Sequence, residues 1–212
     1  MRENKVVILA DGNFPKSSYP LELLYGADTI VCCDNSIVKL LEHTNLMADY
    51  IVGDMDSLSA DNKIKFKDII RHSPDQETND LTKAFNFTKS LNPTKVTILG
   101  ATGQRDDHTL GNISLLITYQ EDMPGLDLAM VTDNGIFTAH SDTFTQNCTK
   151  GEQVSIFAFD PTLKIESAGL VYPTDSVIFD LWWKATLNET ASTSFTLKFS
   201  HPSRVLLYRN LC

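Results

Sequence analysis

The sequence predicts an N-terminal α/β domain built on a parallel sheet (residues 1–122) and a smaller C-terminal all-β sandwich domain (residues 123–212). Up to about residue 120, short apolar runs rich in β-branched residues alternate with helical patterns, which is typical of βαβ units around a parallel sheet. After Pro124 and Gly125, β-branched and aromatic runs recur to the C-terminus and are separated by turn signals. This change in pattern places the domain boundary near residues 120–130.

Short apolar strands are expected in the first domain at residues 6–10, 29–33, 50–53, 69–72 and 95–99. Several of these runs end at a carboxylate or a glycine, such as Asp11, Gly12 and Asp34. Ligands of an open α/β sheet bind at the carboxyl ends of its strands. The acids at these strand ends are therefore a candidate site.

Helices are expected at residues 36–42, 80–90 and 107–119. Thr78 or Asn79 would cap the second helix, which ends before Pro93. In the second domain, Trp182 and Trp183 lie side by side in a strand-like run, so one ring should face inward and the other outward. The outward ring would cover a subunit interface or stack on a cationic aromatic ligand, and we favour the interface.

The composition excludes several classes of function. A formal net charge of −9 argues against nucleic acid or an anionic membrane as the main partner, but it is compatible with a nucleotide that arrives with a metal ion. The N-terminus lacks a signal-peptide pattern, and no apolar run approaches the length of a membrane span. The four cysteines are too few for a disulfide scaffold, so we expect reduced thiols and a cytoplasmic protein.

The first polar cluster follows an expected strand directly and contains Gly53, Asp54, Asp56 and Ser57. Two carboxylates two residues apart at a strand end can face one hard cation, and Mg²⁺ prefers such oxygen ligands. An alternative is that one acid caps the following turn while the other is solvated.

The second cluster begins an expected helix and contains Asp75, Glu77, Asp80 and Lys83. Asp80 either adds a carboxylate to the metal site or simply interacts with the helix dipole. Lys83 lies three residues after Asp80, so it either contacts a phosphate or pairs with that acid, and we favour the pairing.

The third cluster spans residues 100–112, where a strand, a glycine-containing loop and a helix follow one another. This order brings backbone N–H groups and the positive end of a helix to a bound anion. Arg105 would clamp a phosphate or form an ion pair with a neighbouring aspartate, and Asp107 and His108 add polar groups. The sequence contains no HExxH zinc motif and no GxSxG serine-hydrolase motif.

These three clusters, taken in order, resemble the thiamine pyrophosphokinase family. Residues 53–57 resemble the family's Gly-Asp-Phe-Asp-Ser stretch, residues 76–84 its Gln-Asp-x-Thr-Asp segment, and residues 100–112 its Gly-x-x-Gly-x-Arg-x-Asp-His stretch. Asp34 and Asn35 resemble an early Asp-Gly, and residues 187–189 resemble a Ser-Asn-Glu more loosely.

The resemblance implies an enzyme that transfers diphosphate from ATP to thiamine with Mg²⁺, acting as a homodimer with active sites at the interface. It implies Asp34, Asp54, Asp56 and Asp80 as catalytic acids, with Asp54, Asp56, Asp80 and Glu77 as metal ligands. The nucleotide contacts would be Asn35, Lys83, Gly100, Thr102, Gly103, Arg105, Asp107 and His108. The thiamine contacts would be Asn188, Trp182 and Trp183.

The sequence departs from the family pattern at several positions. Glu77 replaces an aspartate and Asn79 a threonine, while Asn35 and Gln104 replace glycines. Leu187 replaces a serine expected near the thiamine, which leaves the acceptor alcohol open. The alternatives are the same chemistry on another small alcohol, such as a hydroxymethylpterin, and a nucleotide-binding sensor without turnover.

Overall fold

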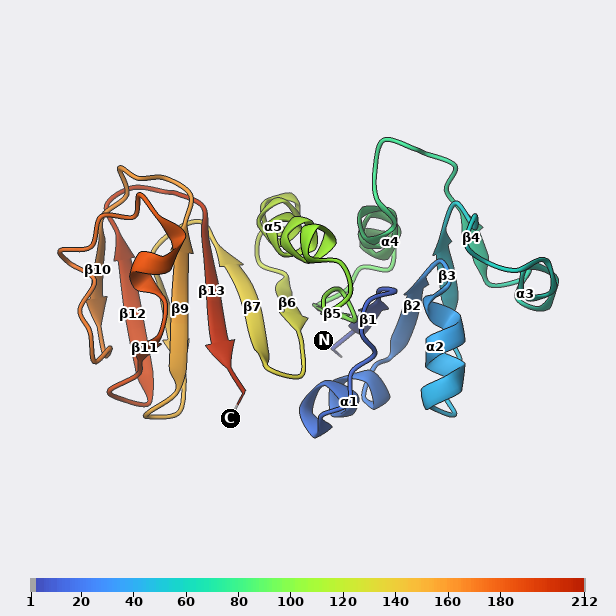
Figure 1. Ribbon diagram of the computed structural model, residues 1–212, viewed down its shortest axis with the longest axis horizontal. Coiled ribbons are helices and arrows are strands. Elements are labelled where there is room, and N and C mark those ends of the chain that lie inside the picture. Colours follow the sequence, from blue (N-terminus) through green and yellow to red (C-terminus); the bar gives the residue numbers. More distant parts are fainter. Residues whose placement is uncertain (1–2, 212) are drawn as a thin grey trace. The chain divides into compact units, whose positions relative to one another are not determined.

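The computed structural model describes residues 3–211, which form two compact units (Figure 1). Unit 1 runs to Leu115 and resumes over Met123–Asp133. Unit 2 contains Leu116–Asp122 and the segment that starts at Asn134. The expected combination of a parallel α/β part and a C-terminal antiparallel sandwich is confirmed.

The strands of unit 1 form a parallel sheet in the order β6-β5-β1-β2-β3-β4. Four of them, β1, β2, β3 and β5, are buried except at their first residue, because helices cover the sheet. Their bounds are β1 Lys5–Leu9, β2 Thr29–Cys33, β3 Tyr50–Gly53, β4 Ile70–His72, β5 Lys95–Leu99 and β6 Asp127–Val131.

The parallel sheet includes β6, which follows Pro124 and Gly125 in the segment assigned to the second domain from sequence. β6 pairs in parallel with β5 from Lys95↔Asp127 to Ile98↔Met130. A strand that is buried on both faces carries the same apolar pattern in a parallel sheet as in a sandwich, so the sequence pattern alone does not separate the two.

The helices of unit 1 are α1 Ser18–Tyr25, α2 Ser36–His43, α3 Ala60–Lys65, α4 Asp80–Lys89 and the first part of α5, which runs over Asp106–Asp122. Figure 1 shows α1 and α2 on one side of the strands and α4 on the other. Asn79 caps α4 as expected, because its side chain accepts a hydrogen bond of 2.8 Å from the Thr82 N–H.

α1 and α3 were not predicted from the sequence. α1 carries Pro20 in its first turn, where proline is tolerated but obscures the helical pattern. α3 has only six residues and buries none of them, so it has no apolar stripe to detect. Its order comes from Ser59, whose hydroxyl accepts a hydrogen bond from the Asn62 N–H.

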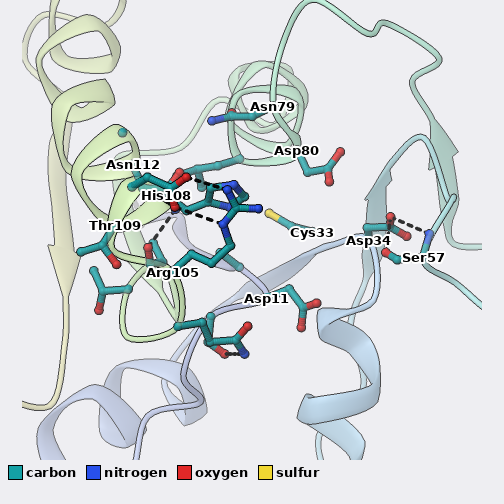
Figure 2. A pocket seen from close by; sticks show the side chains of 18 residues that line it. Asp11, Cys33, Asp34, Ser57, Asn79, Asp80, Arg105, His108, Thr109 and Asn112 are labelled. Carbon is teal, nitrogen blue, oxygen red and sulfur yellow. Dashed lines mark hydrogen bonds and ion pairs between the residues drawn. The ribbon is translucent and has the colours of Figure 1, made fainter.

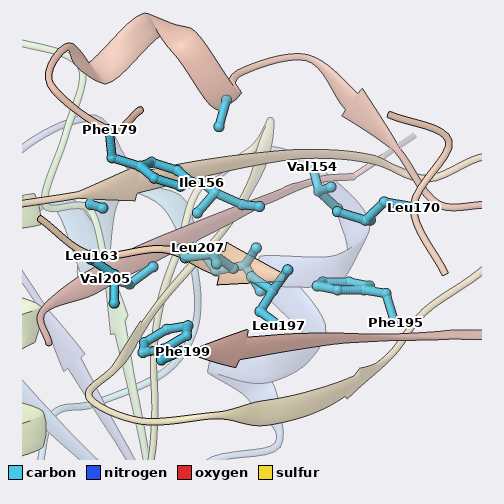
Figure 3. Packing of buried hydrophobic residues seen from close by; sticks show 13 residues of the cluster. Val154, Ile156, Leu163, Leu170, Phe179, Phe195, Leu197, Phe199, Val205 and Leu207 are labelled. Atoms are coloured by element: carbon cyan, nitrogen blue, oxygen red, sulfur yellow. The ribbon is translucent and has the colours of Figure 1, made fainter. Parts of the chain in front are cut away.

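Unit 2 contains two antiparallel sheets, ordered β11-β9-β13-β7 and β10-β12-β8. Their apolar inner faces share one core, formed mainly by residues of β9, β10, β12 and β13 (Figure 3). This packing is a sandwich, as expected from the sequence. The bounds are β7 Gly135–His140, β8 Phe144–Asn147, β9 Gln153–Ala158, β10 Ile165–Ala168, β11 Asn188–Glu189, β12 Ser194–Phe199 and β13 Val205–Asn210.

The predicted strand at Trp182 and Trp183 is wrong. These residues begin a short 3₁₀ helix, η1 (Trp182–Ala185), and both side chains are exposed, at 51% and 68%. Consecutive residues of a 3₁₀ helix are separated by about 120° around its axis, so two neighbours can both face solvent. An ion pair of 2.5 Å between Lys184 and Asp180 spans this helix.

Among residues 3–211, no helix combines the length and the apolar character needed to cross a bilayer.

Candidate active site

A cavity of about 500 Å³ opens at the carboxyl ends of β1, β2 and β5 in unit 1 (Figure 2). The chain proceeds from β1 to β2 on one side of the sheet and later forms β5 on the other side of β1. The strand order therefore reverses beside β1, and such a reversal leaves a crevice outside the strand ends. The topology of unit 1 thus places this cavity at the strand ends where a site was expected from the sequence.

The β1 end contributes Asp11 and Gly12, which the sequence analysis noted only as a strand end. A Cβ atom on Gly12 would lie 2.3 Å from the carbonyl oxygen of Gly100 and 2.5 Å from that of Thr102. The Gly12 N–H donates to the Gly100 carbonyl at 2.6 Å. Only glycine permits this close approach between the loops that follow β1 and β5.

Lys39 of α2 fixes the loop after β1. Its ammonium donates to the carbonyl oxygens of Asp11 and Gly12 at 2.6 and 2.8 Å, and it pairs with the Asp11 carboxylate at 2.8 Å. Lys39 was not predicted from the sequence, because no spacing rule links a helix lysine to carbonyl groups 27 and 28 residues away.

The loop after β5 forms the wall beside this segment. Gly100 and Gly103 have φ angles of +66° and +94°, which glycine adopts without strain. A Cβ on Gly103 would also lie 2.3 Å from the side-chain nitrogen of Asn13. Thr102 and Gln104 line the cavity, and α5 begins directly behind this wall. The expected arrangement of strand, glycine loop and helix is present, with the helix N-terminus at the cavity.

Arg105 and Asp107 both line the cavity and form a bidentate ion pair. The guanidinium donates to the two carboxylate oxygens at 3.1 and 2.6 Å. This pair lowers the pKa of the Asp107 carboxyl to about 2, aided by the hydrogen bond from the His108 N–H. Both side chains are more than 60% exposed, so the pair is open to exchange with an incoming phosphate. His108 lines the same cavity.

Asp34 follows β2 and is 4% exposed. Its φ angle of 41° is in the left-handed region, which is strained for a residue other than glycine. Burial raises the pKa of its carboxyl, whereas hydrogen bonds from Ser57 lower it and the charges of Asp80 and Asp54 raise it further. Its Oδ1 atom is buried and has no hydrogen-bond partner among the described residues.

Asp54 and Asp80 converge on one buried ammonium group. Lys83 Nζ lies 3.1 Å from Asp54 Oδ2 and 3.2 Å from Asp80 Oδ1. Asp80 lines the cavity, whereas Asp54 and Lys83 lie outside its lining. The expected pairing of Lys83 with Asp80 is confirmed, and the pairing with Asp54 was not expected. Hydrogen bonds from the Asp56 N–H and from Lys83 lower the pKa of Asp54.

The remaining expected acids are less well placed. Asp56 and Glu77 are exposed and do not line the cavity. The Asp56 backbone N–H donates to Asp54 Oδ1 at 3.1 Å. Asn35 precedes α2 without a side-chain cap, and it too lies outside the cavity lining.

The donor set fits a magnesium ion by chemical type. Among residues 3–211, no group of three or more Asp, Glu, His or Cys side chains is arranged to hold a metal ion. Asp54 and Asp80 nevertheless both pair with the ammonium of Lys83, and Asp34 has a buried carboxylate oxygen without a partner among the described residues. Carboxylate oxygens are the protein ligands that Mg²⁺ prefers, usually one or two of them together with phosphate oxygens and water.

The expected thiamine contacts all lie in unit 2. Trp182 and Trp183 are exposed on η1, and Trp182 packs edge-to-face on Phe159 with ring centroids 5.2 Å apart. Asn188 is 5% exposed. Its side chain accepts from the Tyr172 N–H at 3.2 Å and donates to the Tyr172 carbonyl at 2.7 Å. In this structure Asn188 therefore fixes the backbone at Tyr172.

Cys33, Thr109 and Asn112 also line the cavity and were not among the individual site residues predicted from the sequence. Cys33 is buried next to Asp34, and burial raises the pKa of its thiol well above the usual range. Thr109 and Asn112 lie on α5, and the Asn112 side chain donates to the Ala101 carbonyl at 2.8 Å. Asn112 lies four residues after His108 and Thr109 lies four residues after Arg105, so helical spacing would have indicated both, because residues three or four apart share a helix face.

Comparison with known families gives two matches that follow the two halves of the chain. The model described as the thiamin pyrophosphokinase catalytic domain matches residues 21–126. The model described as the thiamin pyrophosphokinase substrate-binding domain matches residues 135–208. A curated relative, thiamine pyrophosphokinase 1 of Oryza sativa subsp. japonica, is 36% identical over 81 residues, which are 34% of this chain and 31% of the relative.

Solved structures show the same fold over almost the whole chain. Thiamin pyrophosphokinase from Candida albicans aligns with a TM-score of 0.81 at 20% identity, covering 99% of this chain and 90% of the other. Thiamine pyrophosphokinase from Bacillus subtilis aligns with a TM-score of 0.78 at 18% identity, covering 97% and 98%.

Proposed function

Because the chain belongs to the thiamin pyrophosphokinase family, we propose that it transfers a diphosphate group from ATP to the hydroxyl group of thiamine and releases AMP. The observation that carries this proposal is the cavity beside β1. It has carboxylates on one side, at Asp34 and Asp80, and Arg105 and His108 on the other (Figure 2). An acidic half suits a metal-bound phosphate, and a basic half suits phosphate oxygens directly.

The polyphosphate would lie along the loop after β5. Gly100 and Gly103 let this loop pack closely against Ala10 and Asn13, and the N–H groups at the start of α5 would interact favourably with the negative charge of the phosphates. Arg105 would exchange Asp107 for phosphate oxygens, because its guanidinium binds either partner in the same bidentate geometry. Thr102 and His108 would add hydrogen bonds from the cavity wall.

Asp54, Asp80 and Asp56 would hold Mg²⁺, with Glu77 at the exposed edge of the group. Bound there, the ion would neutralise charge on the phosphates and orient them for displacement. The protein's own contribution is to hold Asp54 and Asp80 together on the rigid ends of β3 and α4. Preorganised charge of this kind supplies most of the acceleration in phosphoryl transfer.

Asp34 would accept the proton of the attacking hydroxyl. A bond forms between the thiamine hydroxyl oxygen and the β-phosphorus, and the bond from the β-phosphorus to the bridging oxygen of AMP breaks. The hydroxyl proton passes to a carboxylate, and AMP leaves with the bridging oxygen. Burial and neighbouring acids raise the pKa of Asp34, which moves it toward the range in which a carboxylate is a useful base.

The thiamine would be bound by unit 2 of a second copy in a cytoplasmic homodimer. Support comes from the exposed aromatic side chains of unit 2, because exposed aromatic groups are typical of interfaces and of sites for cationic rings. These side chains include Tyr172, Trp182 and Trp183. Asn188 would keep Tyr172 in position.

The first experiment is AMP formation from ATP and Mg²⁺ with and without thiamine, with mass spectrometry of the product. We expect equal amounts of AMP and thiamine diphosphate. Asp54→Asn and Asp80→Asn should each reduce turnover on the order of a hundredfold. Asp127→Asn is the matched control, because Asp127 pairs with Lys95 at the amino ends of the strands and should retain activity. ATP bound without AMP formation would indicate a sensor.

Leu187 favours one further acceptor test. It has a φ angle of 57°, is 76% exposed, and stands where a serine is expected near the thiamine. A hydroxymethylpterin is therefore tested in competition with thiamine in the same AMP-release assay. AMP formation with the pterin but not with thiamine would reassign the acceptor and leave the reaction type unchanged.

A further inference from the structure

The ammonium of Lys83 occupies the position between two carboxylates where a cation is expected. Lys83 projects from the first turn of α4, and its side chain is only 3% exposed. Asp54 follows β3 and Asp80 begins α4, with side chains 19% and 39% exposed. The cation therefore approaches the two acids from inside the protein, while the acids remain accessible from outside.

The positive charge of Lys83 and the negative charges of Asp54 and Asp80 stabilise one another. Burying an ammonium is costly unless it is paired and hydrogen-bonded, and the two carboxylates would repel each other without it. Burial opposes the charge of Lys83, but its hydrogen bonds to Asp54 and Asp80 outweigh burial and raise its pKa. The three groups together carry one negative charge, which is a weak attraction for a free divalent cation.

A nucleotide polyphosphate changes this balance. Its oxygens bring several negative charges, which complete the coordination of a divalent cation and offset the positive charge of Lys83. A metal ion that binds alone must share Asp54 and Asp80 with the ammonium of Lys83, which is buried and pairs with the same two carboxylates. A metal ion that arrives with phosphates brings negative charge, and this charge offsets the positive charge of Lys83.

We propose that Lys83 is a built-in counter-ion, which keeps Asp54 and Asp80 together without a divalent cation and makes the site take up that cation with a polyphosphate rather than alone. This inference rests on the proposed function for its choice of polyphosphate. Lys83 is then a positioning residue. The species that binds to the site is the complex of the metal ion with the nucleotide.

The test is Mn²⁺ binding, followed by electron paramagnetic resonance with and without ATP, and without thiamine. The wild type should bind Mn²⁺ weakly alone and much more tightly with ATP. Lys83→Met keeps the length of the side chain and removes the charge, so Mn²⁺ alone should bind about tenfold more tightly, the size of a typical coupling between two sites. Lys89→Met removes the same charge from the last turn of α4 and should behave as the wild type.

Equal affinity for Mn²⁺ alone in the wild type and Lys83→Met, or weaker binding by the variant, would overturn the inference. The melting temperatures of the wild type and Lys83→Met are also compared with those of the same pair in the Asp54→Asn background, where only Asp80 keeps its charge and the two carboxylates no longer repel each other. There, Lys83→Met should reduce the melting temperature less than it does in the wild type, and additive effects would contradict the counter-ion role. Failure of the proposed function would appear separately, as absent AMP formation by the wild type.

Discussion

The hydroxyl of Ser57 donates a hydrogen bond of 2.6 Å to Oδ2 of Asp34. This bond joins the segment after β3 to the end of β2, and it orients a carboxylate whose other oxygen is buried without a partner. Asp34 also has a left-handed backbone, so its orientation depends on contacts that hold it in a strained conformation. Ser57 is thus positioned to control the direction of the unpaired oxygen.

Ser57→Ala should lower kcat about tenfold or more and leave the KM for ATP nearly unchanged. A hydrogen bond to a charged group contributes about 1.5–3 kcal/mol, and the proposed base acts only in the chemical step. Steady-state kinetics with ATP and thiamine varied separately would measure the effects on kcat and on KM. Ser57→Thr retains the hydroxyl and should recover most of kcat. Wild-type kcat in the alanine variant would remove Ser57 from the mechanism.

Gly12→Ala should destabilise the protein by about 1–3 kcal/mol and weaken ATP binding, because the new methyl group meets two backbone carbonyl oxygens. Backbone atoms cannot swing aside as a flexible side chain can. Urea unfolding and ATP titration would measure the two effects. Gly111→Ala is the stability control, since a Cβ there meets nothing within 4 Å and alanine favours the helix. Equal unfolding curves for Gly12→Ala and the wild type would contradict the close loop contact.

The acids at strand ends were predictable because a parallel sheet brings its carboxyl ends to one edge. Asp34 and Asp80 line one cavity although they are 46 residues apart in numbering, and Arg105 joins them after β5. No local pattern identifies Lys39, and Ser57 was placed in the first cluster without its contact to Asp34, because each side chain acts on a segment that the chain reaches through another strand. The charged pairs Lys83–Asp54 and Lys39–Asp11 also depend on side-chain direction, which sequence spacing does not give across elements.

The fold class was predictable because alternating strand and helix patterns are typical of βαβ units. The wrong assignments concern single short segments. The strand β6 and the run at Trp182 both carry apolar or aromatic residues without a clear period. β6 joins the parallel sheet, whereas Trp182 and Trp183 turn outward on a 3₁₀ helix. Short segments of this kind take their structure from what packs beside them.

Arg105→Lys should raise the KM for ATP about tenfold without changing the melting temperature by more than about one degree. Lysine keeps the charge but loses the planar fork that binds two oxygens at once. The ion pair with Asp107 is exposed, so its loss costs little stability. ATP titration at saturating Mg²⁺ and a thermal melt would measure the two effects. An unchanged KM would indicate that Arg105 stays paired with Asp107 during turnover.

The free energy of unfolding should fall between pH 6.5 and pH 4 because of His140. Its ring stacks on Phe144 at 3.5 Å, and burial lowers its pKa to about 4. Between these pH values the unfolded chain binds a proton that the folded protein excludes, so stability rises with pH by up to about 3 kcal/mol. Glu121 and Arg204 line a small cavity together with His140, and their charged side chains pair with each other.

His140→Phe keeps an aromatic ring against Phe144 and removes the titrating group. The variant should therefore lose less stability than the wild type when urea unfolding, followed by circular dichroism, is compared at pH 7 and pH 4.5. Identical losses in the two proteins would show that other groups cause the acid sensitivity.

Trp183→Ala should raise the KM for thiamine and weaken self-association, with little change in the free energy of unfolding at concentrations where the protein is monomeric. The Trp183 side chain is 68% exposed, so its removal leaves no cavity within unit 2. Trp182→Ala is the matched comparison, because Trp182 packs on Phe159 and its loss should cost about 1 kcal/mol or more of stability. Analytical ultracentrifugation and thiamine titration of both variants would separate the roles. If Trp183→Ala leaves the dimer and the KM for thiamine intact, its exposed ring belongs to neither the interface nor the thiamine site, and both would have to be sought elsewhere on unit 2.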